Sequence, residues 1–141
     1  MRHLKSFESL NFEPTIYFAH PINTYGTPIE SECLSLIQER FPSCRIINPG
    51  EKDLQKDFTL YRQDNPNDYM RYFKQLVNDC NYIVYLPFRD EMIGAGIWYE
   101  IQHLATMNDN IYQINLDKNQ ITKVSLDWVN QHKLSIEEAR S

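Results

Sequence analysis

Residues 81–87, Asn-Tyr-Ile-Val-Tyr-Leu-Pro, are β-branched and aromatic almost throughout and therefore predict a buried strand. A helix is expected before this strand, over residues 68–79, because its apolar residues recur along one side. After the strand, Gly94-Ala95-Gly96 is expected to open a second helix that runs to about Met107. A strand between two helices is the unit of a parallel α/β sheet.

The alternation of strands and helices continues on both sides of this unit. Short apolar segments predict further strands at residues 15–19, 45–49 and 111–116. Helices are expected from Pro28, which suits a first helical turn, to about Phe41, and again from near Leu126, followed by a closing turn with a capping box at 135–138. The polar stretch 50–67 has no clean period and is expected to be mainly a long loop.

This order predicts a single α/β domain over residues 1–141, with an N-terminal arm at 1–13. The expected architecture is a three-layer flavodoxin-like or Rossmann-like fold. Its sheet has four to five strands, is mostly parallel and is joined by right-handed crossovers.

Composition narrows the classes of partner. The 14 Lys+Arg against 19 Asp+Glu give a net charge of -5, which disfavours binding to a nucleic acid polymer. No apolar run approaches the roughly 20 residues that span a bilayer, so no membrane partner is expected. The three cysteines show no CxxC spacing and are expected to be free thiols, which fits a cytoplasmic location. The scattered histidines form no metal motif, so no metal is expected.

Ligands of parallel α/β sheets bind outside the carboxyl ends of the strands, and two loops fall there. The first contains His20, Asn23, Thr24 and Gly26, whose amide, hydroxyl and bare backbone suit sugar hydroxyls or a phosphate.

The second loop ends at Gly94 and Gly96, where bare backbone lets a sugar or phosphate approach, or where a tight turn is simply required. The dinucleotide pattern GxGxxG fails at Tyr99, so no cofactor is expected.

Glu100 is the strongest candidate for chemistry. At about 100° per residue it falls at the edge of an apolar stripe, one turn after the Gly-rich opening. Burial there raises the pKa of its carboxyl, whereas the helix N-terminus lowers it. A carboxylate held partly dry beside a cleft suits a nucleophile or a general base. The alternative is a solvated glutamate in the first turns of a helix.

Three segments together resemble the nucleoside 2-deoxyribosyltransferase family. These are Tyr17-Phe-Ala-His-Pro21, the hydrophobic strand at 82–86 and Gly96-Ile-Trp-Tyr-Glu100. The resemblance covers roughly residues 16–116. It implies cleavage or transfer at the N-glycosidic bond of a nucleoside or nucleoside 5′-monophosphate, through a glutamate nucleophile that forms a ribosyl ester.

The resemblance also implies roles for individual residues. Glu100 would be the nucleophile, Tyr17 would orient it, and Asp90 would contact the sugar or protonate the leaving base. Asn115 resembles a position that completes a neighbouring subunit's site, which implies a homo-oligomer. The chain departs from the family at Phe73, where members usually carry an acid that holds the substrate base.

Alternatives remain open at this stage. A hydrolase of nucleosides or 5′-monophosphates fits as well as a transferase, with the loop at 24–27 holding a 5′-phosphate. A TIR-like NAD glycohydrolase would use a glutamate on a related layer. A catalytically inactive nucleotide-binding sensor or regulator is the third possibility, because the family's acids are missing.

Overall fold

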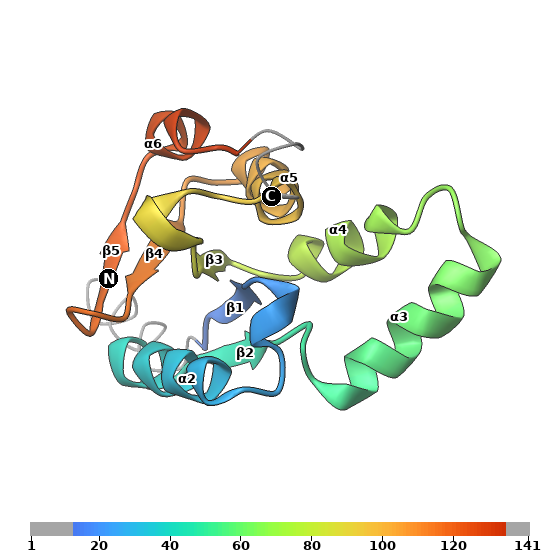
Figure 1. Cartoon of the computed structure of the whole chain (residues 1–141), viewed down its shortest axis with the longest axis horizontal. Helices are drawn as coiled ribbons and strands as arrows, with labels where there is room; N and C mark the ends of the chain where they lie inside the picture. Colours follow the sequence, from blue (N-terminus) through green and yellow to red (C-terminus); the bar gives the residue numbers. More distant parts are fainter. Residues whose placement is uncertain (1–12, 135–141) are drawn as a thin grey trace, which may run out of the picture.

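A computed structural model describes residues 13–134 of the chain, and the side chain of Arg89 within this range is left undescribed. Five strands form one sheet in the order β2-β1-β3-β4-β5 (Figure 1). They are β1 Thr15–Ala19, β2 Arg45–Ile47, β3 Tyr82–Tyr85, β4 Ile111–Asn115 and β5 Gln120–Lys123. The first four strands are parallel, and β5 runs antiparallel to β4 at the edge of the sheet.

The helices complete three layers. Helix α2 Pro28–Arg40 covers one face of the sheet with Cys33 and Ile37. Helices α4 Met70–Asn78, α5 Ala95–Ala105 and α6 Leu126–Gln131 lie on the other face. Two short 3-10 turns, Ile22–Thr24 and Arg89–Glu91, follow β1 and β3. The predicted fold class is therefore confirmed, with the predicted strand at 81–87 in the central position.

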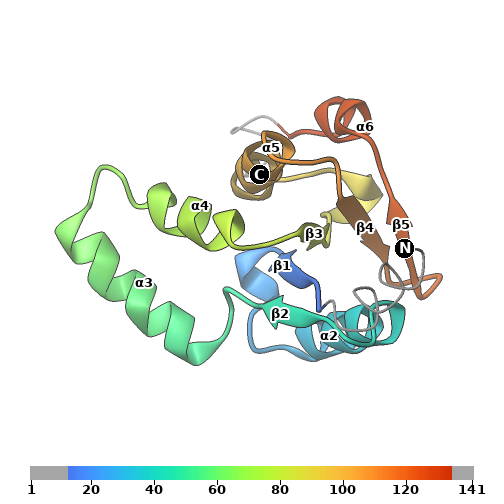
Figure 2. The same cartoon turned by 180° about the vertical axis from the view of Figure 1, so that it is seen from behind.

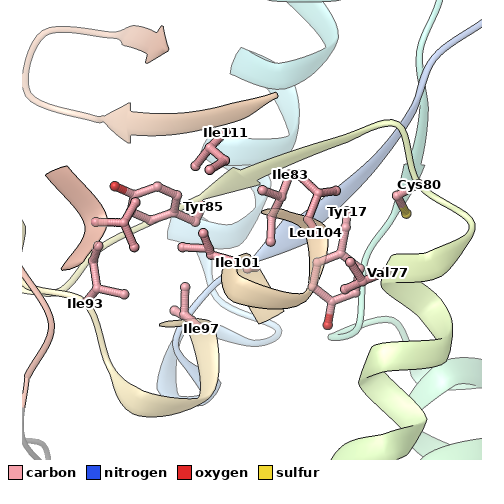
Figure 3. Packing of buried hydrophobic residues seen from close by; sticks show 12 residues of the cluster. Tyr17, Val77, Cys80, Ile83, Tyr85, Ile93, Ile97, Ile101, Leu104 and Ile111 are labelled. Carbon is pink, nitrogen blue, oxygen red and sulfur yellow. The ribbon is translucent and has the colours of Figure 1, made fainter. Parts of the chain in front are cut away.

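The larger part of the core lies between the sheet and α5. Alternate residues of β1 and β3 point to this side, so Tyr17, Ile83 and Tyr85 pack against Ile101 and Leu104 (Figure 3). The intervening residues, such as Phe18 and Val84, face α2. This alternation places the hydroxyl group of Tyr17 on the α5 side of the sheet, within reach of Glu100.

The prediction of a long loop over residues 50–67 is wrong. Helix α3 Lys52–Asp64 occupies most of it and projects beyond the sheet beside α4 (Figures 1 and 2). Its half-buried Leu54, Phe58 and Tyr61 follow the helical spacing of four and three, but no α3 residue is fully buried. The apolar stripe is therefore thin, and the ring of Phe58 packs on the aromatic residues at 69, 72 and 73.

The remaining predictions concern the cysteines, the two ends of the chain and membrane-spanning helices. Cys33 and Cys80 are buried free thiols, and Cys44 is a half-buried one. The capping box predicted at 135–138, and all but the last residue of the arm predicted at 1–13, lie outside the described residues. Within residues 13–134, no helix has the length and apolar character that crossing a membrane requires.

Candidate active site

A cleft of about 470 Å³ opens at the carboxyl ends of β1 and β3. In the strand order observed here, chain connections reverse between these two strands, and ligands of such sheets bind at that reversal. The loop after β1, the loop after β3, and helices α4 and α5 all contribute to its lining. The lining residues are His20, Pro21, Ile22, Asn23, Tyr25, Met70, Phe73, Phe88, Gly94, Ala95, Gly96, Ile97 and Glu100.

Glu100 and Tyr17 form a buried pair at this cleft. The Tyr17 hydroxyl donates a hydrogen bond to Oε2 of Glu100, although the two residues lie 83 positions apart in the chain. Tyr17 is completely buried, and only 8% of Glu100 is exposed. Glu100 shares its helix face with Ile97, Ile101 and Leu104, so it is buried more deeply than the edge of an apolar stripe suggests. The hydrogen bond fixes the orientation of its carboxylate.

Burial dominates the protonation of this pair. It raises the pKa of Glu100 to about 7, while the hydrogen bond from Tyr17 acts in the opposite direction. Burial, and then the charge of Glu100, raise the pKa of Tyr17 well above its usual value. The same two causes raise the pKa of Tyr25. The phenols therefore keep their protons, and near neutral pH the titrating group of the three is the Glu100 carboxyl.

His20 fixes the loop after β1. Its ring stacks on Phe18 with centroids 3.9 Å apart, and its Nδ1 lies 3.1 Å from the Phe18 carbonyl oxygen. Its Nε2 lies 2.8 Å from Oε2 of Glu30, whose other oxygen accepts from the Gly26 backbone N–H at 3.2 Å. Burial lowers the pKa of His20, against the opposing effect of Glu30. These contacts make His20 a positioning residue for the loop that carries Asn23 and Tyr25.

The Gly-rich turn provides bare backbone at the cleft. A Cβ atom on Gly94 would lie 2.6 Å from Cε2 of Phe88, so only glycine lets that ring lie against the start of α5. A Cβ atom on Gly96 would meet nothing within 4 Å. Gly96 thus presents exposed backbone in the first turn of a helix, next to the carboxylate of Glu100 one turn later.

The structure brings some of the predicted residues together and leaves others apart. His20, Asn23, Gly94, Gly96 and Glu100 line the cleft, with Tyr17 bonded to Glu100. Besides Tyr17, four predicted residues are absent from the lining: Thr24, Gly26, Asp90 and Asn115.

Three of these residues lie in the loops after β1 and β3, and Asn115 is the last residue of β4. The Thr24 hydroxyl donates to the Pro21 carbonyl oxygen at 2.6 Å, and Gly26 adopts a φ of 71°. Asp90 is exposed, with a φ of 59°. Asn115 accepts from the Lys118 backbone N–H at 3.2 Å in the turn between β4 and β5. These residues thus belong to the loops and the strand end around the cleft and not to its lining.

Sequence reasoning missed the apolar wall of the cleft. Met70 and Phe73 come from α4, and Phe88 comes from the loop after β3. Apolar side chains carry no chemical motif, and the sequence points to Phe73 only as a position where the resembling family carries an acid. The single usable signal was the position of Phe88, which directly follows a strand that ends at the ligand-binding edge.

The described lining residues include no Lys or Arg, and residues 13–134 contain no cluster of His, Cys, Asp or Glu that could hold a metal ion. The site therefore consists of the buried carboxyl group of Glu100 in a cleft lined by polar side chains of the β1 loop and by aromatic rings. Comparisons with protein-family models, curated proteins and solved structures found no match to this chain.

Proposed function

We propose that the protein cleaves the N-glycosidic bond of a nucleoside, with Glu100 as the nucleophile. The observation that carries this proposal is a buried carboxyl group that lines a cleft and is oriented by a buried tyrosine. Tyr17 binds Oε2, and within the described part of the chain Oε1 has no hydrogen-bond partner. Oε1 is therefore the oxygen available to an electrophilic carbon.

The proposed reaction has two steps. In the first, a Glu100 oxygen forms a bond to the anomeric carbon while the bond from that carbon to the base nitrogen breaks. The base leaves with the electron pair and takes up a proton from solvent; the water or base that attacks next returns one proton to solvent. In the second, water or another base attacks the anomeric carbon, the ester bond breaks, and the Glu100 carboxylate is restored. The configuration at the anomeric carbon is retained, because it is inverted twice.

The surroundings of Glu100 fit a sugar. Asn23 and Tyr25 bring an amide and a phenol to the lining, and Gly96 brings bare backbone. The positive charge that develops on the sugar favours the ionised form of the buried Glu100, which burial otherwise disfavours.

The test is to trap the covalent intermediate. We expect wild-type protein incubated with 2-fluoro-sugar nucleosides to gain the mass of one fluorinated sugar, located on Glu100 by peptide mapping. The fluorine destabilises the positive charge on the sugar and slows the second step, so the ester accumulates. A label on another residue, or base release without any ester, would contradict a Glu100 nucleophile.

A second candidate is a nucleotide-binding sensor or regulator without catalysis. It is favoured by the placement of Asp90, the expected proton donor, away from the cleft lining. Incubation with nucleosides, 5′-monophosphates and NAD distinguishes the candidates. Tight binding without free base indicates the sensor, whereas nicotinamide released from NAD alone indicates an NAD glycohydrolase.

A further inference from the structure

The polar side chains of the cleft lining come from one loop, whereas apolar side chains come from several elements, including Pro21 and Ile22 of that same loop. The polar side chains His20, Asn23 and Tyr25 belong to the loop after β1. The apolar group consists of Met70 and Phe73 on α4, together with Phe88 after β3 and Ile97 on α5. A ligand that fills this cleft therefore meets the Asn23 amide and the Tyr25 phenol from this loop, and the side chains of the apolar group from the other elements.

Both phenylalanine rings of the apolar group are held in place by their neighbours. The ring of Phe73 packs on Phe58 of α3, with centroids 4.6 Å apart. Phe88 is fixed by its backbone, since its N–H donates to the Met92 carbonyl oxygen at 2.7 Å, and its ring lies against Gly94. Rings that are packed against neighbours in this way lose little conformational entropy when a flat ligand packs on them.

We propose that Phe73 and Phe88 form the subsite for the base of the substrate, and that this subsite selects flat heteroaromatic rings by stacking and not by their hydrogen-bonding edges. This inference rests on the proposed function. It also follows from the division of the lining: the sugar lies at Asn23, Tyr25 and Glu100, and its planar substituent then extends toward the ring faces.

Stacking has a measurable consequence for selectivity. A site that hydrogen-bonds to a substrate group rejects the analogue lacking that group by about 10⁴-fold or more, because its own polar atoms stay unpaired. A stacking site tolerates the change, since every base has a π face. Nucleosides that differ only in exocyclic amino or oxo groups should therefore bind the protein with similar affinity.

The experiment measures binding by calorimetry in the full-length Glu100→Gln background, so that turnover does not interfere. The probes are purine riboside, adenosine and inosine. We expect their Kd values to agree within about tenfold. We expect Phe73→Leu and Phe88→Leu each to weaken binding of all three by about tenfold, and Phe73→Tyr to retain it.

Tyr61→Leu is the matched control, because Tyr61 belongs to the same aromatic cluster but does not line the cleft. It should leave all three affinities unchanged. The inference is overturned if the Kd values spread beyond tenfold with the exocyclic groups, if Phe73→Leu acts no differently from Tyr61→Leu, or if no probe binds. Base release by the wild-type protein tests the proposed function separately, because it is unaffected by how selectivity for the base arises.

Discussion

The protonation of Glu100 depends on apolar neighbours from its own helix and on one hydroxyl group from a residue 83 positions away in the chain. The helix places it among Ile97, Ile101 and Leu104, and burial there disfavours its charged form. The Tyr17 hydroxyl, from the first strand, opposes this effect by hydrogen bonding to the carboxylate. Burial is the larger effect, which leaves a carboxyl group that changes its charge near neutral pH.

The raised pKa of Glu100 makes a prediction about stability. Its pKa is 4.5 in the unfolded chain and about 7 in the folded protein, so folding favours the protonated form. The associated stability is complete below pH 4.5 and is lost as the pH rises through 7; the full difference corresponds to roughly 3 kcal/mol. Urea unfolding should show that Glu100→Gln stabilises the protein more at pH 8 than at pH 5. A pH-independent difference would contradict the buried, titrating carboxyl.

Tyr17 should control the protonation of Glu100. Tyr17→Phe removes the hydrogen bond that lowers the pKa of Glu100. The rate of base release rises with pH as Glu100 ionises, so this rise should move to higher pH. The control is Tyr85→Phe, which removes an equally buried hydroxyl that donates to Gln113 at 2.7 Å away from the cleft lining. Both variants should lose about 1–2 kcal/mol of stability. A shifted pH profile in both, or in neither, would contradict the assigned role.

At the scale of elements, the Gly-rich turn joins the cleft to the start of α5. Gly94→Ala should place a methyl group against the Phe88 ring and destabilise the fold by about 1–3 kcal/mol. Gly96→Ala is the matched control, because its methyl group meets nothing within 4 Å and alanine favours the helix by up to about 1 kcal/mol. Thermal unfolding measures both. Equal effects of the two substitutions would show that Phe88 does not lie against Gly94.

The elements that the sequence predicted best are those with strong local signals. β3 and the predicted start of α5 are confirmed because β-branched residues and glycines are strong local signals. Helix α3 was missed because its stripe of Leu54 and Phe58 is thin and only half buried.

For the site too, the sequence predicted what local signals specify and not what depends on packing. Residues with chemical function, such as Asn23 and Glu100, were found by position and type. Their place in one cleft with Phe73 depends on how α4 packs beside α5, which no local pattern specifies.

At the scale of the whole molecule, α3 projects beyond the sheet beside α4 (Figure 1). No residue of α3 is buried, and Leu60 on this helix is 62% exposed. We expect the protein to form a homo-oligomer, and contact through α3 would cover the exposed Leu60 side chain.

Light scattering should therefore give a multiple of the 16.8 kDa chain mass, and Leu60→Glu should reduce it. Met107→Glu, at the exposed end of α5, is the control and should not. A fully active monomer at working concentration would contradict this expectation.

The most direct test of the whole account is base release from a nucleoside panel by wild-type protein and by Glu100→Gln under identical conditions. The glutamine keeps nearly the same shape but cannot form the ester, so its rate should fall by about a thousandfold or more, while Kd changes much less. Equal rates for the two proteins would remove Glu100 from the mechanism, and no release by either would replace the glycosidase with a nucleotide-binding sensor.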